Sequence, residues 1–236
     1  MKTKRNILPA VACAMAALAL SACNGAGSAD NPTLEPELTR AAPRTVEPTT
    51  PTPEPTAPKT PREALDATFR LAVEDADDYW ATKRITFPTR VQSTDDGLVC
   101  PRPSVHERAW ACENGTVMYD PDKMLPLLDE PTGGAGIAVI ASHEVGHLAQ
   151  YAFDSTFNTS SPAGERGATC SAGAHFRWNV DGSGALPRMD MDTARRAVEE
   201  AYPTEGMPGM DAEGTRVARE QFDVGLTTAL PCLGKG

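Results

Sequence analysis

The spacing of hydrophobic residues predicts that most of the chain after residue 60 is helical. The first predicted helix begins at Thr60-Pro61-Arg62-Glu63, which combines a capping box with a proline at the first helical position. One face of this helix carries a row of apolar residues: Leu65, Phe69, Ala72, Ala76 and Trp80. A second run, Ile137 to Leu148, predicts a largely buried helix after Gly133-Gly134. Further helices are expected after Ser161-Pro162, after Asp192, and from about Ala212 to Leu226.

A short β region is predicted between the first two helices. Asn114-Gly115 is a strong two-residue hairpin signal, and it joins residues 109–112 to residues 116–119. Asp120-Pro121 then opens another short helix. The expected fold class is therefore α+β, mostly helical with a small β-sheet or hairpin.

The N-terminal residues 1–22 have the order expected of a lipoprotein signal peptide. A basic start is followed by an apolar stretch too short for a comfortable membrane span, and the stretch ends in Leu20-Ser21-Ala22-Cys23. These four residues resemble the lipobox of bacterial lipoproteins, in which the cysteine is lipidated. Ordinary secretory cleavage and an uncleaved anchor are the alternatives. We expect Cys23 to attach the protein to the outer face of the bacterial cell membrane, in an extracytoplasmic position.

Residues 23–60 are expected to form a disordered tether, because Pro, Thr, Ala and Glu dominate and large apolar residues are scarce. Residues 61–236 then form one folded domain. The formal net charge is −10, and removal of 1–22, with three basic and no acidic residues, makes it −13. A surface this acidic argues against nucleic acid as a partner.

The segment Ser142-His143-Glu144-Val145-Gly146-His147-Leu148 carries the chemistry, because it contains the pattern H-E-x-x-H on a predicted helix. Residues four apart lie on one helical face, so the imidazoles of His143 and His147 can meet on one metal ion. Glu144 then lies beside the metal, where a carboxylate can take a proton from water that zinc has made acidic. The pattern predicts amide hydrolysis by a zinc metalloendopeptidase.

The third metal ligand is predicted to be Glu165. A metzincin would need glycine at position 150 and histidine at position 153, where this chain has Gln150 and Phe153. Asp154 lies two helical turns beyond His147 and is too far along the axis. Glu165 follows a predicted loop and starts the next helix, so an antiparallel return would bring it back to the histidines. From spacing alone, an exposed acid at a helix start is an equal alternative.

Two motifs resemble those of the bacterial neutral zinc metallopeptidases, a gluzincin-like family. The family's A-H-E-x-G-H-x-x-Q matches residues 142–150, and its E-L-Q-A-D-C-x-A-G matches residues 165–173. The resemblance implies a zincin-like fold, Zn²⁺ as the cofactor, Glu165 as the third ligand, and a peptide or protein substrate in the cell envelope.

The chain departs from the family at Thr169, where the family has aspartate. An acid there commonly orients a ligand histidine through its other ring nitrogen, and a threonine hydroxyl accepts that hydrogen bond only weakly. A catalytically silent zincin-fold surface lipoprotein that acts as a binding module therefore stays an alternative, and a metal-carrying lipoprotein is a weaker one. His175 is a candidate to stabilise the oxyanion, with Tyr119, Tyr202 and Arg216 as competitors and a purely structural role as the simpler interpretation.

Four cysteines remain beyond the signal segment and Cys23, and an even number in an exported domain suggests two disulfides. Three pairings are possible. We favour Cys100 with Cys112, and Cys170 with Cys232. Zinc ligation by these cysteines is the alternative, and it fits poorly because none has C-x-x-C spacing.

Overall fold

The computed structural model describes residues 60–102, 107–156, 161–203, 211–228 and 232–233. The predicted signal peptide, Cys23 and all but the last residue of the predicted tether lie outside these residues. Within the described residues, no helix is both long enough and apolar enough to cross a membrane.

Helix α1 (Pro61–Thr82) begins as predicted. The Thr60 side chain accepts a hydrogen bond from the Glu63 backbone, and the Glu63 carboxylate accepts one from the Thr60 backbone. Two orphan donors of the first turn are thereby satisfied. The predicted apolar face is buried, and it faces helix α3 (Ala135–Phe153).

A three-stranded sheet follows α1. The strands β1 (Arg90–Ser93), β2 (Ala109–Ala111) and β3 (Thr116–Tyr119) lie in the order β1-β3-β2. The hairpin between β2 and β3 is the predicted one and is antiparallel, whereas β1 runs parallel to β3. Strand β2 is thus an edge strand, and it packs beside α3.

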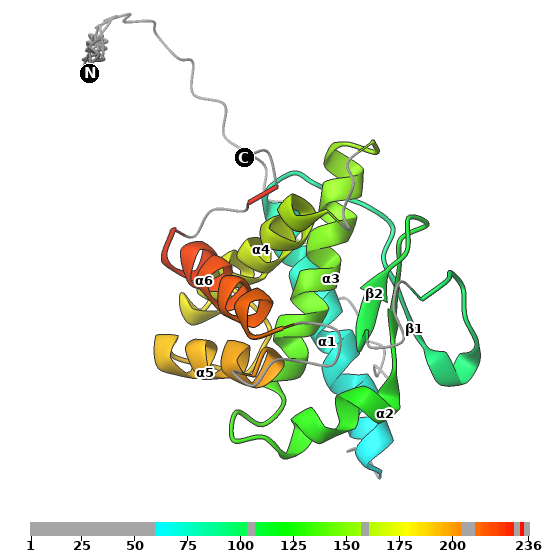
Figure 1. Cartoon of the computed structure of the whole chain (residues 1–236), viewed down its shortest axis with the longest axis horizontal. Helices are drawn as coiled ribbons and strands as arrows, with labels where there is room; N and C mark the ends of the chain where they lie inside the picture. The colour runs from blue at the N-terminus through cyan, green and yellow to red at the C-terminus, as the bar shows by residue number, and fades with distance from the viewer. Residues whose placement is uncertain (1–59, 103–106, 157–160, 204–210, 229–231, 234–236) are drawn as a thin grey trace, which may run out of the picture. The chain divides into compact units, whose positions relative to one another are not determined.

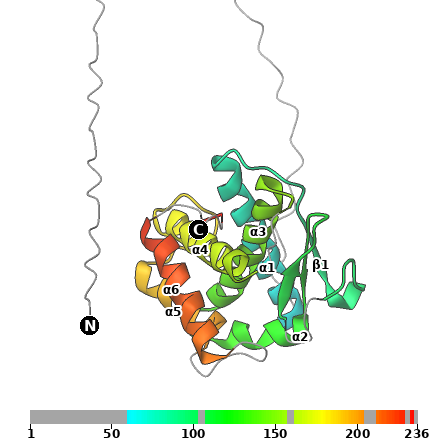
Figure 2. The ribbon, with the colours of Figure 1, turned by 45° about the horizontal axis from the view of Figure 1, so that its top comes forward.

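The chain then passes through α2 (Pro121–Met124) and the 3₁₀ helix η2 (Leu125–Asp129) into α3. Helix α3 is buried from Gly136 to Gln150. In Figure 1 it lies between α1 and the sheet on one side and the C-terminal helices on the other. The view in Figure 2 shows the same order. A helix buried on all sides can hold polar groups only where partners satisfy them, which makes its histidines informative.

The C-terminal helices are α4 (Pro162–Val180), α5 (Met191–Ala201) and α6 (Ala212–Thr228). Helix α5 starts slightly earlier than predicted, because Asp190 rather than Asp192 caps it by accepting from the Thr193 backbone. Its buried face is thin and consists of Ala194, Ala197, Val198 and Ala201. Helices α4 and α6 pack very closely. A Cβ atom on Gly225 would lie 1.8 Å from the Cys170 carbonyl oxygen, so only glycine fits there.

The structure contains both favoured disulfides, Cys100–Cys112 and Cys170–Cys232. The first closes the segment before the hairpin, and the second ties residue 232 to α4. With a large helical part and one small sheet, the described residues confirm the α+β class.

Candidate metal centre

Three predicted side chains, two from α3 and one from α4, meet at one point. Nε2 of His143 lies 3.0 Å from Nε2 of His147 and 3.2 Å from Oε2 of Glu165. Nε2 of His147 lies 3.6 Å from the same carboxylate oxygen. Both histidines are buried, whereas 49% of the Glu165 side chain is exposed. Glu165 thus closes the triangle from the solvent side.

The size of this triangle matches a zinc site. Zinc binds imidazole nitrogen and carboxylate oxygen at about 2.0 to 2.2 Å, so two such ligands in a tetrahedral arrangement lie about 3.4 Å apart. The three observed separations, 3.0, 3.2 and 3.6 Å, bracket that value. Two nitrogens and one oxygen leave a fourth tetrahedral position open to water or a substrate.

The triangle forms because α3 and α4 approach closely at Gly146. A Cβ atom at Gly146 would lie 3.1 Å from both Cα and the carbonyl oxygen of Ala168. Because glycine lacks that atom, the backbone of α4 can lie against the turn of α3 between the two histidines. Glu165, one turn before Ala168, then reaches the imidazoles. This glycine is therefore needed for the geometry of the triangle.

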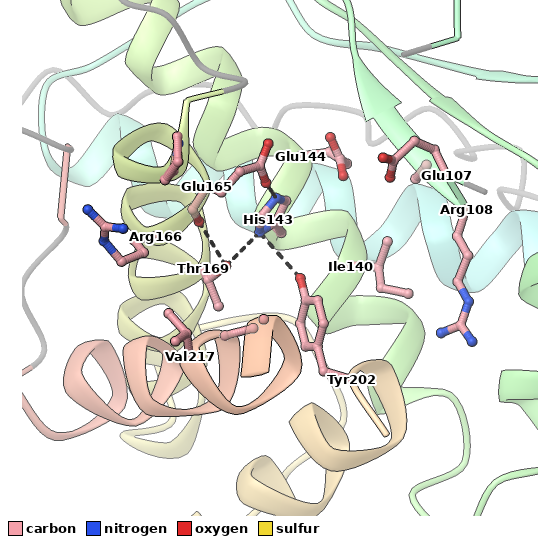
Figure 3. A pocket seen from close by; sticks show the side chains of 14 residues that line it. Glu107, Arg108, Ile140, His143, Glu144, Glu165, Arg166, Thr169, Tyr202 and Val217 are labelled. Carbon is pink, nitrogen blue, oxygen red and sulfur yellow. Dashed lines mark hydrogen bonds and ion pairs between the residues drawn. The ribbon is translucent and has the colours of Figure 1, made fainter. Parts of the chain in front are cut away.

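Two hydroxyl groups contact the outer ring nitrogen of His143 (Figure 3). Nδ1 of His143 lies 3.0 Å from Oγ1 of Thr169 and 3.3 Å from the hydroxyl of Tyr202. The Thr169 hydroxyl donates its own proton to the backbone carbonyl of Glu165, 2.9 Å away. Its lone pairs are therefore free to accept from Nδ1–H, which leaves Nε2 of His143 unprotonated for a metal.

His147 is oriented in the same way by Gln150. Nδ1 of His147 lies 2.9 Å from Oε1 of Gln150, and the amide nitrogen of Gln150 donates to the carbonyl of Gly164. Gln150 is fully buried and joins α3 to the first turn of α4. Its role was not predicted from the sequence, although a residue three positions after His147 lies on the same helical face.

Glu144 lies next to the triangle and is buried. Burial raises the pKa of the Glu144 carboxyl, and the negative charge of Glu165 raises it further. The two histidines and a hydrogen bond from the backbone N–H of Ala111 on β2 lower it. The net result is a raised pKa. A raised pKa suits a group that must accept a proton near neutral pH, and a bound cation would lower it.

The ligand groups shift one another's proton affinities. Burial raises the pKa of Glu165, but the interactions of its carboxylate with both histidines outweigh this effect and hold the pKa well below its usual range. Burial lowers the pKa of His147, but Glu165 and Glu144 more than compensate, so that pKa is raised. A cation bound between Glu165 and His147 would therefore compete with protons for these groups.

A pocket of about 320 Å³ opens beside His143 and Glu144. Besides the metal-site residues, Glu107, Arg108, Ile140, Arg166 and Val217 are among its lining. Glu107 precedes β2, and its side chain is solvent-exposed but partly desolvated; this desolvation, together with the charges of Glu144 and Glu165, raises its pKa. The pocket thus borders two of the three residues of the triangle, His143 and Glu165.

His175 does not line the pocket, and both of its ring nitrogens are engaged elsewhere, which argues against it as an oxyanion donor. Nε2 of His175 lies 2.7 Å from the Asp75 carboxylate, and Nδ1 lies 2.8 Å from the Ser142 hydroxyl. All three residues are at most 2% exposed. The order Asp75, His175, Ser142 is that of a hydrolytic triad, but the serine is buried within α3 and also bonds the Ala138 carbonyl. The network is structural, and it fixes the side chain of Ser142, the residue directly before His143.

Tyr119, Arg216 and Asp154, which the sequence also offered as candidates, make contacts with other residues among the described ones. The Tyr119 hydroxyl donates to Asp66, and Arg216 is exposed and pairs with Glu213 and Glu220. Asp154 accepts from Thr156 beyond the end of α3. Of the competitors for the oxyanion role, only Tyr202 lines the pocket.

The chain matches no model of a known protein family, no curated protein and no solved structure. The resemblance to the neutral zinc metallopeptidases therefore rests on the residues of the two motifs.

Proposed function

We propose that the protein is a zinc-dependent metallopeptidase with a zincin-like domain, tethered through Cys23 to the outer face of the bacterial cell membrane. The observation that carries this proposal is the triangle of His143, His147 and Glu165, with Glu144 beside it. A purely structural metal site would use four protein ligands and would need no carboxylate next to an open position. The proposed substrate is a peptide or protein of the cell envelope.

The residues divide the work of peptide hydrolysis. A zinc ion held by the triangle supplies Lewis acidity and lowers the pKa of water to about 7. Glu144 accepts the proton of the attacking water at its carboxylate and returns it to the nitrogen of the leaving amine. Thr169 and Gln150 keep each imidazole in the tautomer that turns Nε2 toward the centre. Strand β2, an edge strand beside Glu144, lies where an extended peptide can pass.

A second candidate is a catalytically silent binding module with the same domain. It is favoured by one observation: His143 meets the neutral hydroxyl of Thr169 where the resembled family has a carboxylate. A neutral acceptor makes the imidazole less basic, which weakens the hold on zinc.

Zinc content and peptide cleavage by the purified full chain, next to the Glu144→Gln variant, separate these candidates. The proposed function expects one zinc per chain in both proteins, and cleavage of a mixed peptide library by the parent only. Zinc without cleavage in either protein would favour the binding module. Loss of zinc in the parent would overturn the metal centre itself.

A further inference from the structure

Part of the pocket beside the metal triangle is lined by apolar side chains. Ile140 lies three residues before His143 on α3, so the two residues share a helical face. Val217 and Ala218 on α6 also line the pocket. Figure 3 shows Val217 and Ile140 on either side of Tyr202, whose hydroxyl points to His143. The Tyr202 ring therefore offers carbon, not its hydroxyl, to this part of the pocket.

The charged lining residues leave this part apolar. The side chain of Arg108 is engaged, since its guanidinium donates to the backbone carbonyl of Ala201. Glu107 and Arg166 are exposed. Ile140, Ala218 and Tyr202 are in contrast only 6 to 8% exposed. A charged ligand group among them would lose its hydration without gaining a partner, whereas an apolar group would be stabilised there.

We propose that this apolar part of the pocket receives a large aliphatic or aromatic side chain next to the scissile peptide bond. The inference rests on the proposed peptidase function for the cleavage step. It adds a substrate class to it: peptides with leucine- or phenylalanine-like residues at the cleavage site. Ile140, Val217 and Ala218 are then the residues that determine specificity.

The test uses peptides of one sequence in which each residue flanking the cleaved bond is in turn Leu, Phe, Ala, Lys or Glu. The full chain is expected to cleave the Leu or Phe peptide at least about tenfold faster than the Ala peptide in kcat/KM, since a methylene in an apolar pocket changes this ratio about 10- to 200-fold. Lys and Glu at the same position should be cleaved more slowly than Ala.

Two variants place the preference at this pocket. Ala218→Leu fills it, so cleavage of the Phe peptide should fall at least tenfold relative to the Ala peptide. Val217→Ala enlarges it and should shift the preference from Leu toward Phe. Ala212→Leu makes the first exchange at an exposed position of the same helix and should leave the preference unchanged. Zinc content and melting temperature are measured for each variant, so that a folding defect is recognised.

A binding experiment separates the failure of this proposal from failure of the proposed function. The Kd of each peptide is measured with zinc-loaded Glu144→Gln, which is expected to bind without cleaving. Cleavage by the parent with no preference among the side chains overturns the apolar pocket and leaves the peptidase. Tighter binding of Leu and Phe peptides without any cleavage by the parent keeps the pocket and overturns the peptidase. Equal binding of all peptides and no cleavage overturn both.

Discussion

The hydroxyl of Thr169 lies 3.0 Å from Nδ1 of His143, on the edge of the imidazole opposite to the nitrogen that faces His147 and Glu165. The position at which the chain departs from the resembled family thus still contacts the histidine. The hydroxyl can accept because its proton is committed to the carbonyl of Glu165. The departure replaces a charged acceptor by a neutral one that a second hydroxyl, from Tyr202, supports.

Replacing Thr169 by valine is expected to weaken zinc binding by about 10- to 100-fold, because valine keeps the shape and removes the acceptor for Nδ1–H. The measurement is competition for zinc with a chelator of known affinity. Thr169→Ser retains the hydroxyl and should bind zinc nearly as the parent does. Equal affinities for the valine and serine variants would show that the hydroxyl does not orient His143.

Zinc is expected to stabilise the packing of α4 against α3, because two ligands of the triangle lie on α3 and the third, Glu165, lies on α4. At a free zinc concentration about 100 times the Kd, binding adds about 2.7 kcal/mol to the free energy of unfolding. A chelator should therefore lower the melting temperature of the parent clearly, and that of Glu165→Gln much less. Glu199→Ala, an exposed acid on α5, is the control and should respond to the chelator as the parent does.

Gly146→Ala should destabilise the metal-free protein by about 1 to 3 kcal/mol, since the added methyl lies 3.1 Å from the backbone of Ala168. The sign is diagnostic, because this exchange in an unconstrained helix stabilises by up to about 1 kcal/mol. Denaturant unfolding measures it. Gly136→Ala, on the same helix, meets mainly the side chain of Glu200 at 3.3 Å and should cost less. A stabilised Gly146 variant would contradict the close approach of α3 and α4.

Asp75→Asn should lower stability at neutral pH by about 1.5 to 3 kcal/mol, the value of a hydrogen bond to a charged group. Burial raises the pKa of Asp75, but hydrogen bonds from His175 and from the backbone of Ala185 outweigh it, and the folded-state pKa is lowered. Its contribution is therefore present above the ordinary carboxyl pKa of 3.8 and is lost as the pH falls through and below that value.

The check is the difference in melting temperature between parent and Asp75→Asn at pH 7 and pH 3, which should shrink at pH 3. Asp77 provides a control of opposite sign on the same helix. Burial, together with Asp78, raises its pKa, so Asp77→Asn should not destabilise at pH 7. If the difference in melting temperature between parent and Asp75→Asn is the same at both pH values, the charge of Asp75 does not stabilise the fold.

Local signals explain why several elements could be predicted. The capping box of Thr60 and Glu63 and the turn Asn114-Gly115 fix backbone geometry within a few residues, and the structure contains both. The predicted start of α5 is two residues late, because Asp190 and Asp192 are both suitable N-caps in the sequence and the structure uses Asp190. Strand β1 was not located, because its four residues are defined by parallel pairing with a strand 26 positions away, Arg90 with Thr116.

The candidate site likewise contains contacts that local spacing predicts and contacts that depend on tertiary packing. His143 and His147 are related by helical spacing, so their proximity is a local property. Tyr202 is 59 residues from His143 and Asp75 is 100 residues from His175, and only the packing of separate helices brings these pairs together. Nothing in the sequence near Tyr202 indicates an imidazole as its partner.

Because its contact face is thin, α5 is expected to detach first when the protein is heated. Its buried residues are three alanines and one valine, which contribute little apolar area, and Tyr202 follows directly at its end. Local detachment of α5 would withdraw Tyr202 from His143 while α1, α3 and the sheet stay folded. Amide hydrogens of α5 should accordingly exchange with solvent sooner than those of α3. On heating, activity should be lost at a lower temperature than the one at which the whole domain unfolds.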